Sequence, residues 1–303
     1  MQTMKNPKKY IRNFTEISIN DLSEVGGKNA SLGEMIKTLY EKGIRVPDGF
    51  AVTATAYWDF VSTNLLSDRI KALLDQLNRS TFENLEFIGE QIRTLILHTS
   101  FPESLNDAIR SGYLALAAKY GSEITLAVRS SATAEDLPDA SFAGQQETYL
   151  NVKGIENLLQ AVHGCYASLF TNRAIKYRED HGFDHTKVAL SAGVQLMIRS
   201  DLASSGVIFT LDPDSGFRDV ILVSSSWGLG ENVVQGTVNP DEFYVFKPAL
   251  NRAKQAIITH KLGSKAKTMI FKENSSGTVN TDTPPEKQEQ YSISDDEIFT
   301  ECD

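Results

Sequence analysis

Two kinds of hydrophobic pattern divide the sequence. Apolar side chains between Leu32 and Leu39 recur every three or four positions, which is the spacing of one helical face. The pattern predicts a first helix that starts near Ser31, and the same spacing returns from Thr55 to Lys119, which predicts a helical insertion. From Ile124 onward the apolar runs become short and rich in β-branched residues, which is typical of strands.

The strand-like runs follow one another along the second part of the chain. One long helical stretch, Ile155–Tyr177, interrupts them, and Ser294 with Glu297 three residues later has the spacing of a capping box that opens a last helix. Helices mixed with mostly sequential strands indicate an α+β architecture. The predicted strands are Ile124–Val128, Lys187–Ile198, Val207–Phe209, Val220–Val223, Glu242–Phe246, Ala256–Ile258 and Met269–Phe271.

The composition is that of a globular protein and excludes several classes. Of the 303 residues, 41% are apolar and 23% are charged, and no run of ~18 apolar residues is long enough to span a bilayer. The N-terminus has no secretory signal pattern, and the two cysteines, Cys165 and Cys302, are too few for a disulfide framework. A net charge of −9 disfavours nucleic-acid binding. The sequence therefore predicts a cytoplasmic protein with neither a membrane nor a nucleic acid as partner.

Two glycines and a lysine precede the predicted first helix. Backbone N–H groups of Gly26 and Gly27, with the ammonium group of Lys28, would converge on a phosphate there. The segment is not a Walker A loop, because that loop requires serine or threonine at the position of Asn29. From these residues alone, an ordinary glycine turn with a solvated lysine is an equal alternative.

A second candidate site follows the predicted strand Ile124–Val128. Arg129 and Ser130 would emerge at the carboxyl end of that strand, where ligands gather in α/β sheets, and an arginine binds phosphate oxygens with two parallel hydrogen bonds. The small-residue loop that follows includes Gly144, Gln145 and Thr148. An ordinary surface loop is the alternative interpretation.

A third candidate is the end of the strand that contains Gln195 and Met197. Its backbone groups would pair with an adenine edge while Met197 packs on the base, although taken alone these residues fit a buried strand better. The loop Trp227–Asn232 lacks the third glycine of a dinucleotide fingerprint, which disfavours that class of site. The five histidines show no metal-binding spacing, so the sequence identifies no metal ligand.

These motifs together resemble the phosphoenolpyruvate synthases, the pyruvate, water dikinases of the pyruvate phosphate dikinase family. The resemblance covers nearly the whole chain, and its segments occur in the family's order. The segments are Val25–Gly33, Val46–Phe50, Ala127–Pro138, Ala140–Thr148, Trp227–Asn232 and Val234–Tyr244.

The resemblance implies an ATP-grasp-like nucleotide site that uses ATP and Mg²⁺. It implies an N-terminal subdomain at residues 1–123, which holds the Gly-Gly-Lys loop and the helical insertion, and an ATP-grasp-like subdomain at residues 124–303. The residues it assigns to the site serve three purposes. Lys28 and Arg129 would contact the transferring phosphates, Gly144 and Thr148 would belong to a loop that covers them, and Gln195 with Met197 would line the adenine site.

Some of the family's segments do not occur in this sequence. They carry a metal-binding acid, a further phosphate-binding arginine and the histidine that passes the phosphoryl group to pyruvate. We therefore expect a C-terminally truncated domain that depends on phosphohistidine and pyruvate-binding domains. One chain of a split enzyme, completed by a separate chain with these domains, is an alternative. A noncatalytic nucleotide-binding remnant, or the nucleotide domain of an antibiotic phosphotransferase of the same family, is another alternative; the tract Thr281–Glu286 favours the synthase.

Overall fold

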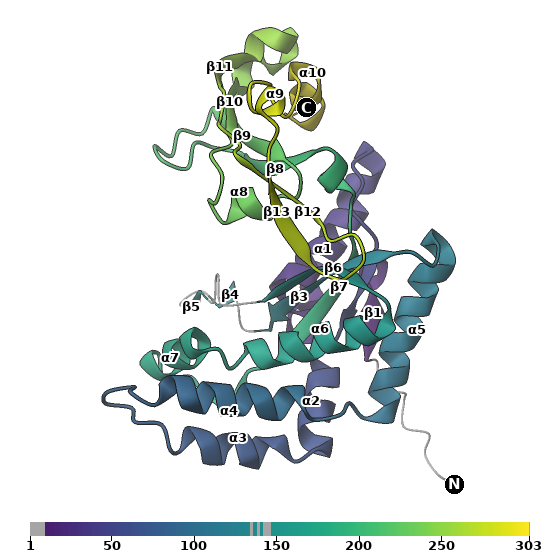
Figure 1. The fold of residues 1–303 in the computed structure, drawn as a ribbon, viewed down its shortest axis with the longest axis vertical. Coiled ribbons are helices and arrows are strands. Elements are labelled where there is room, and N and C mark those ends of the chain that lie inside the picture. The colour runs from purple at the N-terminus through teal and green to yellow at the C-terminus, as the bar shows by residue number, and fades with distance from the viewer. Residues whose placement is uncertain (1–9, 134–135, 138–139, 142–146, 303) are drawn as a thin grey trace. The chain divides into compact units, whose positions relative to one another are not determined.

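The computed structural model describes residues 10–133, 136–137, 140–141 and 147–302, and it divides into two compact units, Met1–Met197 and Ile198–Asp303. The centre of the first unit is a five-stranded antiparallel sheet with the strand order β1-β2-β7-β3-β6 (Figure 1). Its strands are β1 (Ile11–Asn13), β2 (Gly49–Val52), β3 (Thr125–Ala132), β6 (Thr148–Lys153) and β7 (Leu190–Leu196), and a separate pair is formed by β4 (Asp136–Leu137) and β5 (Ala140–Ser141).

Helices cover both faces of this sheet. One face packs against α1 around a small core that includes Phe14, Val25 and Ala51. The other face contributes Val128 and Val194 to a much larger core, which the remaining helices complete, with α6, α4 and α3 stacked in turn (Figure 1). The helices are α1 (Leu22–Leu39), α2 (Ala54–Thr63), α3 (Leu66–Leu74), α4 (Leu85–Leu97), α5 (Glu103–Tyr120), α6 (Ile155–Ser168) and α7 (Asn172–Asp180).

The first helix differs from its prediction. It begins at Leu22 rather than near Ser31, and it is broken at Gly26, whose φ of 74° and ψ of 166° are not helical. The helical face predicted from Leu32 onward is therefore only the last part of α1. The predicted start is too late because a pair of glycines is typical of a loop, whereas only Gly26 leaves the helical conformation. Val25, before the break, is fully buried in the small core under α1.

Two further predictions about helices have different outcomes. The predicted insertion from Thr55 to Lys119 is helical, as α2 to α5. The stretch Ile155–Tyr177 is two helices rather than one, because Thr171 caps a new helix by accepting a hydrogen bond from the backbone N–H of Ala174 at 3.2 Å.

The second unit is built on an antiparallel sheet with the strand order β11-β10-β9-β8. One face packs on α10 around a core that includes Val223, Phe243 and Ile298. Ser294 and Glu297 form the predicted capping box: the backbone N–H of Ser294 donates to Glu297 Oε2 at 2.8 Å, and the backbone N–H of Glu297 donates to Ser294 Oγ at 3.3 Å. The elements are β8 (Ser204–Phe209), β9 (Val220–Trp227), α8 (Glu231–Val234), β10 (Asp241–Phe246), β11 (Ile257–Lys261), β12 (Lys267–Phe271), β13 (Thr278–Asp282), α9 (Pro285–Gln288) and α10 (Asp295–Cys302).

A hairpin of β12 and β13 packs against the glycine loop of the same unit. Gly228 has a φ of 85°, and a Cβ atom there would lie 2.5 Å from the carbonyl oxygen of Met269. Only glycine allows this close approach of two backbones. The loop Trp227–Asn232 thus has a clear packing role, since it receives β12.

The architecture is mixed helix and sheet, as the α+β prediction requires. Along the sequence, the boundary between the two compact units falls after Met197, whereas the boundary between the predicted subdomains falls after residue 123. Strand β3, which follows residue 123, pairs with β7 in the sheet of the first unit. The predicted subdomain division stays a prediction. In the part of the chain that the structure describes, no helix is long and apolar enough to cross a bilayer.

Candidate functional site

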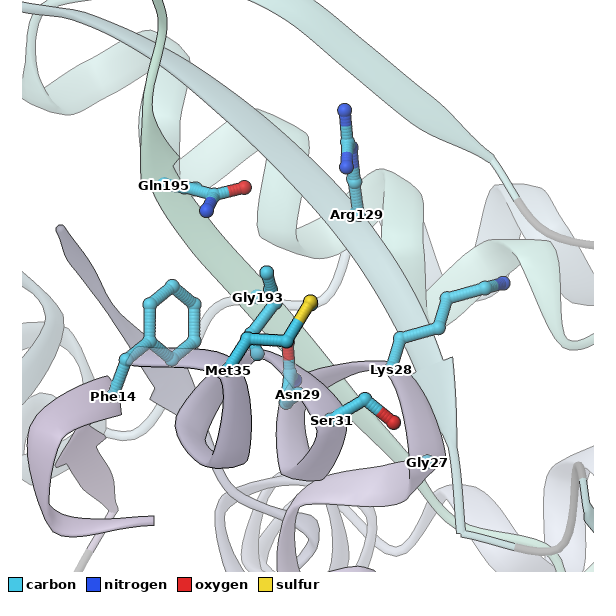
Figure 2. A pocket seen from close by; sticks show the side chains of 10 residues that line it. Phe14, Gly27, Lys28, Asn29, Ser31, Met35, Arg129, Gly193 and Gln195 are labelled. Carbon is cyan, nitrogen blue, oxygen red and sulfur yellow. The ribbon is translucent and has the colours of Figure 1, made fainter. Parts of the chain in front are cut away.

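A pocket of about 500 Å³ lies in the first unit, on the face of the sheet that α1 covers (Figure 2). Helix α1 forms one wall, and strands β3 and β7 contribute the other (Figure 2). The lining residues are Phe14, Gly27, Lys28, Asn29, Ser31, Leu32, Met35, Arg129, Gly193 and Gln195.

Strand register explains which sheet residues reach the pocket. Arg129 of β3 lies directly opposite Gly193 of β7, so both belong to the same face of the sheet. Gln195 is two residues beyond Gly193 on the same strand and therefore shares that face. Ser130 falls on the alternate face, is 1% exposed, and donates its hydroxyl to the carbonyl oxygen of Glu147 at 3.3 Å.

Two cationic side chains reach the pocket from different elements. Lys28 belongs to the first turn of α1 after the break at Gly26, and Arg129 belongs to β3; both are exposed. Figure 2 shows them on the same side of the pocket. The positive end of the helix that starts at Gly27 adds its dipole to these charges. The arrangement favours an anionic ligand such as a phosphate group.

The break at Gly26 lets α1 approach the sheet. A Cβ atom at Gly26 would lie 2.3 Å from Ser131 Oγ and 2.5 Å from the Ser131 carbonyl oxygen. Its φ of 74° is also a conformation that favours glycine. Gly26 therefore serves the docking of the helix and does not line the pocket, whereas Gly27 does.

The opposite side of the pocket is less charged. Phe14 and Met35 lie on that side in Figure 2, and Leu32 is a further apolar lining residue. Gln195 is 7% exposed, and its Nε2 donates to the carbonyl oxygen of Pro47 at 3.0 Å, which fixes the amide. The pocket therefore joins a cationic part to an apolar part, a combination that suits a ligand with a charged group and an aromatic or apolar body.

Two further predicted site residues, Thr148 and Met197, do not line this pocket. Thr148 begins β6 directly opposite Arg129, so it is the cross-strand neighbour of that arginine. Met197 is half-buried, and its Sδ accepts a hydrogen bond from the backbone N–H of Asn151 at 2.9 Å. The backbone N–H of Met197, one residue after the end of β7, donates to the carbonyl oxygen of Thr125 at 2.9 Å. Gly144 and Gln145 lie outside the described residues.

Residue types alone did not single out several lining residues. Asn29 was noted only as a departure from a Walker A loop, yet it lines the pocket and is 2% exposed. Gly193 was also missed, although a glycine inside a strand is a signal of close approach by another group. Met35 belongs to the apolar helical face predicted between Leu32 and Leu39, and the structure shows that it is 38% exposed and lines the pocket.

The described residues do not form a metal site. Within them, no group of three or more histidine, cysteine, aspartate or glutamate side chains could hold a metal ion. The residues that line the pocket include no carboxylate.

Comparison with known proteins connects this pocket to a family. Residues 22–300 match the family described as pyruvate phosphate dikinase, AMP/ATP-binding domain. The chain is 53% identical to the phosphoenolpyruvate synthase of Neisseria meningitidis serogroup B over 95% of its own length and 37% of that protein. It is 49% identical to the Helicobacter pylori enzyme of the same name, over 96% of this chain and 36% of the relative. The Escherichia coli phosphoenolpyruvate synthase is also 49% identical, over 94% of this chain and 36% of the relative.

The chain thus spans about a third of the length of these curated relatives. The match covers all of α1, both strands that carry Arg129 and Gln195, and nearly all of the second unit. The family resemblance indicated by the motifs is confirmed. The chain belongs to the pyruvate phosphate dikinase AMP/ATP-binding domain family.

Proposed function

We propose that this chain is the ATP-binding part of a phosphoenolpyruvate synthase. The observation that carries the proposal is the convergence of Lys28 and Arg129, from α1 and β3, on one pocket at the start of a helix. The match to an AMP/ATP-binding domain supports a nucleotide as the ligand. In this proposal the two cations and the helix start hold the phosphate groups of ATP.

The two cations have complementary tasks. The planar guanidinium of Arg129 binds two phosphate oxygens at once, whereas the ammonium of Lys28 acts as a compact charge that follows a single oxygen. Both would stabilise negative charge on the transferring group, which is the main task of the protein in phosphoryl transfer. Mg²⁺ would enter as the ion that accompanies ATP in solution.

The complete reaction requires parts that this chain does not span. The names of the relatives support the synthesis of phosphoenolpyruvate. We propose that the whole enzyme converts pyruvate, ATP and water to phosphoenolpyruvate, AMP and phosphate, by way of the phosphohistidine that the family resemblance implies on another domain. We propose an ATP-grasp-like site in which the loop with Gly144, Gln145 and Thr148 covers the phosphates and Gln195 with Met197 contacts the adenine. The isolated chain is then expected to bind ATP without making phosphoenolpyruvate.

Calorimetric titration with ATP in the presence of Mg²⁺ tests this function. Each charge-assisted contact contributes about 1.5–3 kcal/mol, so Lys28→Ala and Arg129→Ala should each weaken binding by about 10-fold to 150-fold. Lys37→Ala is the matched control, because Lys37 is an exposed lysine of the same helix that does not line the pocket. Equal affinities for the parent and both pocket variants would refute the proposed phosphate site.

Failure of the folded parent chain to bind ATP would favour the alternative of a noncatalytic remnant. A positive result leaves a second question, since a nucleotide domain also serves antibiotic phosphotransferases. Mixing the chain with the remaining domains of a phosphoenolpyruvate synthase distinguishes the two. Restored formation of phosphoenolpyruvate from pyruvate supports the synthase.

A further inference from the structure

Asn29 is a buried polar residue beside the proposed phosphate site. Its side chain amide donates to the carbonyl oxygen of Val25 and to Ser191 Oγ, each at 3.0 Å. Its backbone N–H donates to Ser131 Oγ at 3.4 Å. Asn29 thus connects α1 to both neighbouring strands, β3 through Ser131 and β7 through Ser191.

Strand register places these contacts one step from the proposed phosphate site. Ser131 lies directly opposite Ser191, and the next pair on the same face is Arg129 with Gly193. Residues two positions apart on a strand are about 7 Å apart. The contacts of Asn29 are therefore fixed at a short distance, along rigid strands, from the arginine proposed to bind phosphate.

The sheet is shaped to receive this side chain. A Cβ atom at Gly193 would lie 2.2 Å from Asn29 Oδ1, so any larger residue at that position would displace the amide. The hydroxyl of Ser191 donates to the carbonyl oxygen of Val52 at 2.7 Å, which directs its lone pairs toward Asn29. Each polar group in this cluster has a defined orientation, which is what a positioning device requires.

We propose that Asn29 is a positioning residue for ATP binding. It locks the part of α1 that follows the break at Gly26 onto the sheet, and it thereby fixes the backbone of Lys28, its neighbour in sequence, relative to Arg129. The need for such a lock follows from the break at Gly26, because its non-helical φ and ψ interrupt α1 two residues before Lys28. This inference rests on the proposed ATP-binding function.

A double-mutant cycle on the full chain tests the inference. Asn29→Ala should weaken ATP binding by about 5-fold to 10-fold, because a displaced cation forfeits part of its contact energy. In the Lys28→Ala background the same change should weaken binding less than about 2-fold, since the group that Asn29 positions is already gone. Equal losses in the two backgrounds, or no loss in the parent, would overturn the proposal.

A second readout separates positioning from general destabilisation and does not require ATP. Hydrogen–deuterium exchange of residues 22–39 should accelerate in Asn29→Ala without nucleotide. Thr171→Ala is the control, because Thr171 also fixes a helix start, that of α7, and does not line the pocket. It should leave both the exchange of α1 and the affinity for ATP unchanged.

The two readouts give distinct results if either proposal fails. Accelerated exchange in Asn29→Ala together with no ATP binding by the parent would reject the proposed function while supporting the lock. Unchanged exchange would reject the lock whatever the affinity. If Asn29→Ala does not fold, Ser191→Ala removes one bond from the strand side, and a weakening of ATP binding by about 2-fold to 5-fold is expected only in the presence of Lys28.

Discussion

At the scale of single residues, the site depends on small residues as much as on charged ones. Lys28 and Arg129 were identified from the sequence because cations next to glycine and serine suggest phosphate binding. Gly26 and Gly193 matter because of what approaches them, Ser131 and Asn29 respectively. Their importance depends on the pairing of β3 with β7, a long-range register that the sequence does not reveal.

Gly26 provides a direct test of this close approach. Gly26 and Gly154 have nearly the same backbone conformation, with φ and ψ of 74° and 166° for the first and 77° and 160° for the second. No atom lies within 4 Å of a Cβ added at Gly154, whereas one added at Gly26 would collide with Ser131. Both alanine variants therefore bear the same conformational strain, and only one of them also collides with the sheet.

We expect Gly26→Ala to lower the free energy of unfolding by about 1–3 kcal/mol more than Gly154→Ala, which is the range for overpacking a tight site. Urea unfolding followed by circular dichroism measures the difference. Equal destabilisation by the two variants would show that α1 does not press against Ser131 in solution.

At the scale of elements, a regular spacing of apolar residues predicts helices and strands that the structure contains, whereas strands without such a spacing escape prediction. The amphipathic helix α4 and the apolar strand β7 lie within their predicted ranges, and α5 ends one residue beyond its range, at Tyr120. β6 and β13 were missed, because sequences such as Thr148–Lys153 alternate weakly and gain their strand structure from pairing with β3 and β12. Arg129 was expected after a strand but lies inside β3, whose polar residues Ser130 and Ser131 concealed its true length.

A hydrogen-bond network joins the end of α7 to the segment that follows it. Arg178 Nε donates to His185 Nδ1 at 2.8 Å, and His185 Nε2 lies 3.0 Å from Glu179 Oε1. Because Nδ1 must accept, the neutral ring carries its proton on Nε2 and donates it to Glu179. Burial and the charge of Arg178 lower the pKa of His185 below its usual value. Glu179 also accepts from Arg79 Nε at 2.9 Å.

This network predicts a loss of stability in acid. The folded state holds His185 neutral at a pH where the unfolded chain, with an ordinary histidine pKa of about 6.5, already binds a proton. The unfolded state therefore binds more protons, so stability is complete above about pH 6.5 and falls as the pH drops toward the lowered pKa of the folded state. For one proton the slope cannot exceed about 1.4 kcal/mol per pH unit.

Comparison with His185→Gln isolates this contribution, because the lowered pKa of His163 and the Glu179 pair with Arg79 persist in both proteins. Urea unfolding between pH 7.5 and pH 5 should show a steeper loss of stability in the parent than in the variant. Parallel curves would mean that His185 titrates alike in the folded and unfolded chains.

At the scale of the whole molecule, each compact unit has apolar cores and buried polar groups of its own. In the first unit one buried polar cluster is the one around Asn29. In the second unit another is the ion pair of Lys265 with Asp241, whose side chains are both 0% exposed and 2.5 Å apart. Asp241 also accepts from the backbone N–H groups of Gly263 and Ser292, so its charge is fully hydrogen-bonded.

Removal of one partner of this pair should affect the second unit selectively. Lys265→Met leaves the carboxylate of Asp241 buried without a counter-ion, which costs about 3–5 kcal/mol. Lys267→Met is the matched control, because Lys267 pairs with Asp282 on the surface, where the two side chains are 51% and 86% exposed and such a pair contributes about 0–1 kcal/mol.

Hydrogen–deuterium exchange locates the damage along the chain. Since the cores of Met1–Met197 and Ile198–Asp303 are built from separate residues, Lys265→Met should accelerate exchange in β9 and β10 while β3 and β7 keep their protection. Selective loss would mean that the lysine and arginine proposed to bind phosphate belong to a unit whose stability is independent of the second. Equal acceleration in all four strands would instead show that the chain unfolds as one cooperative unit.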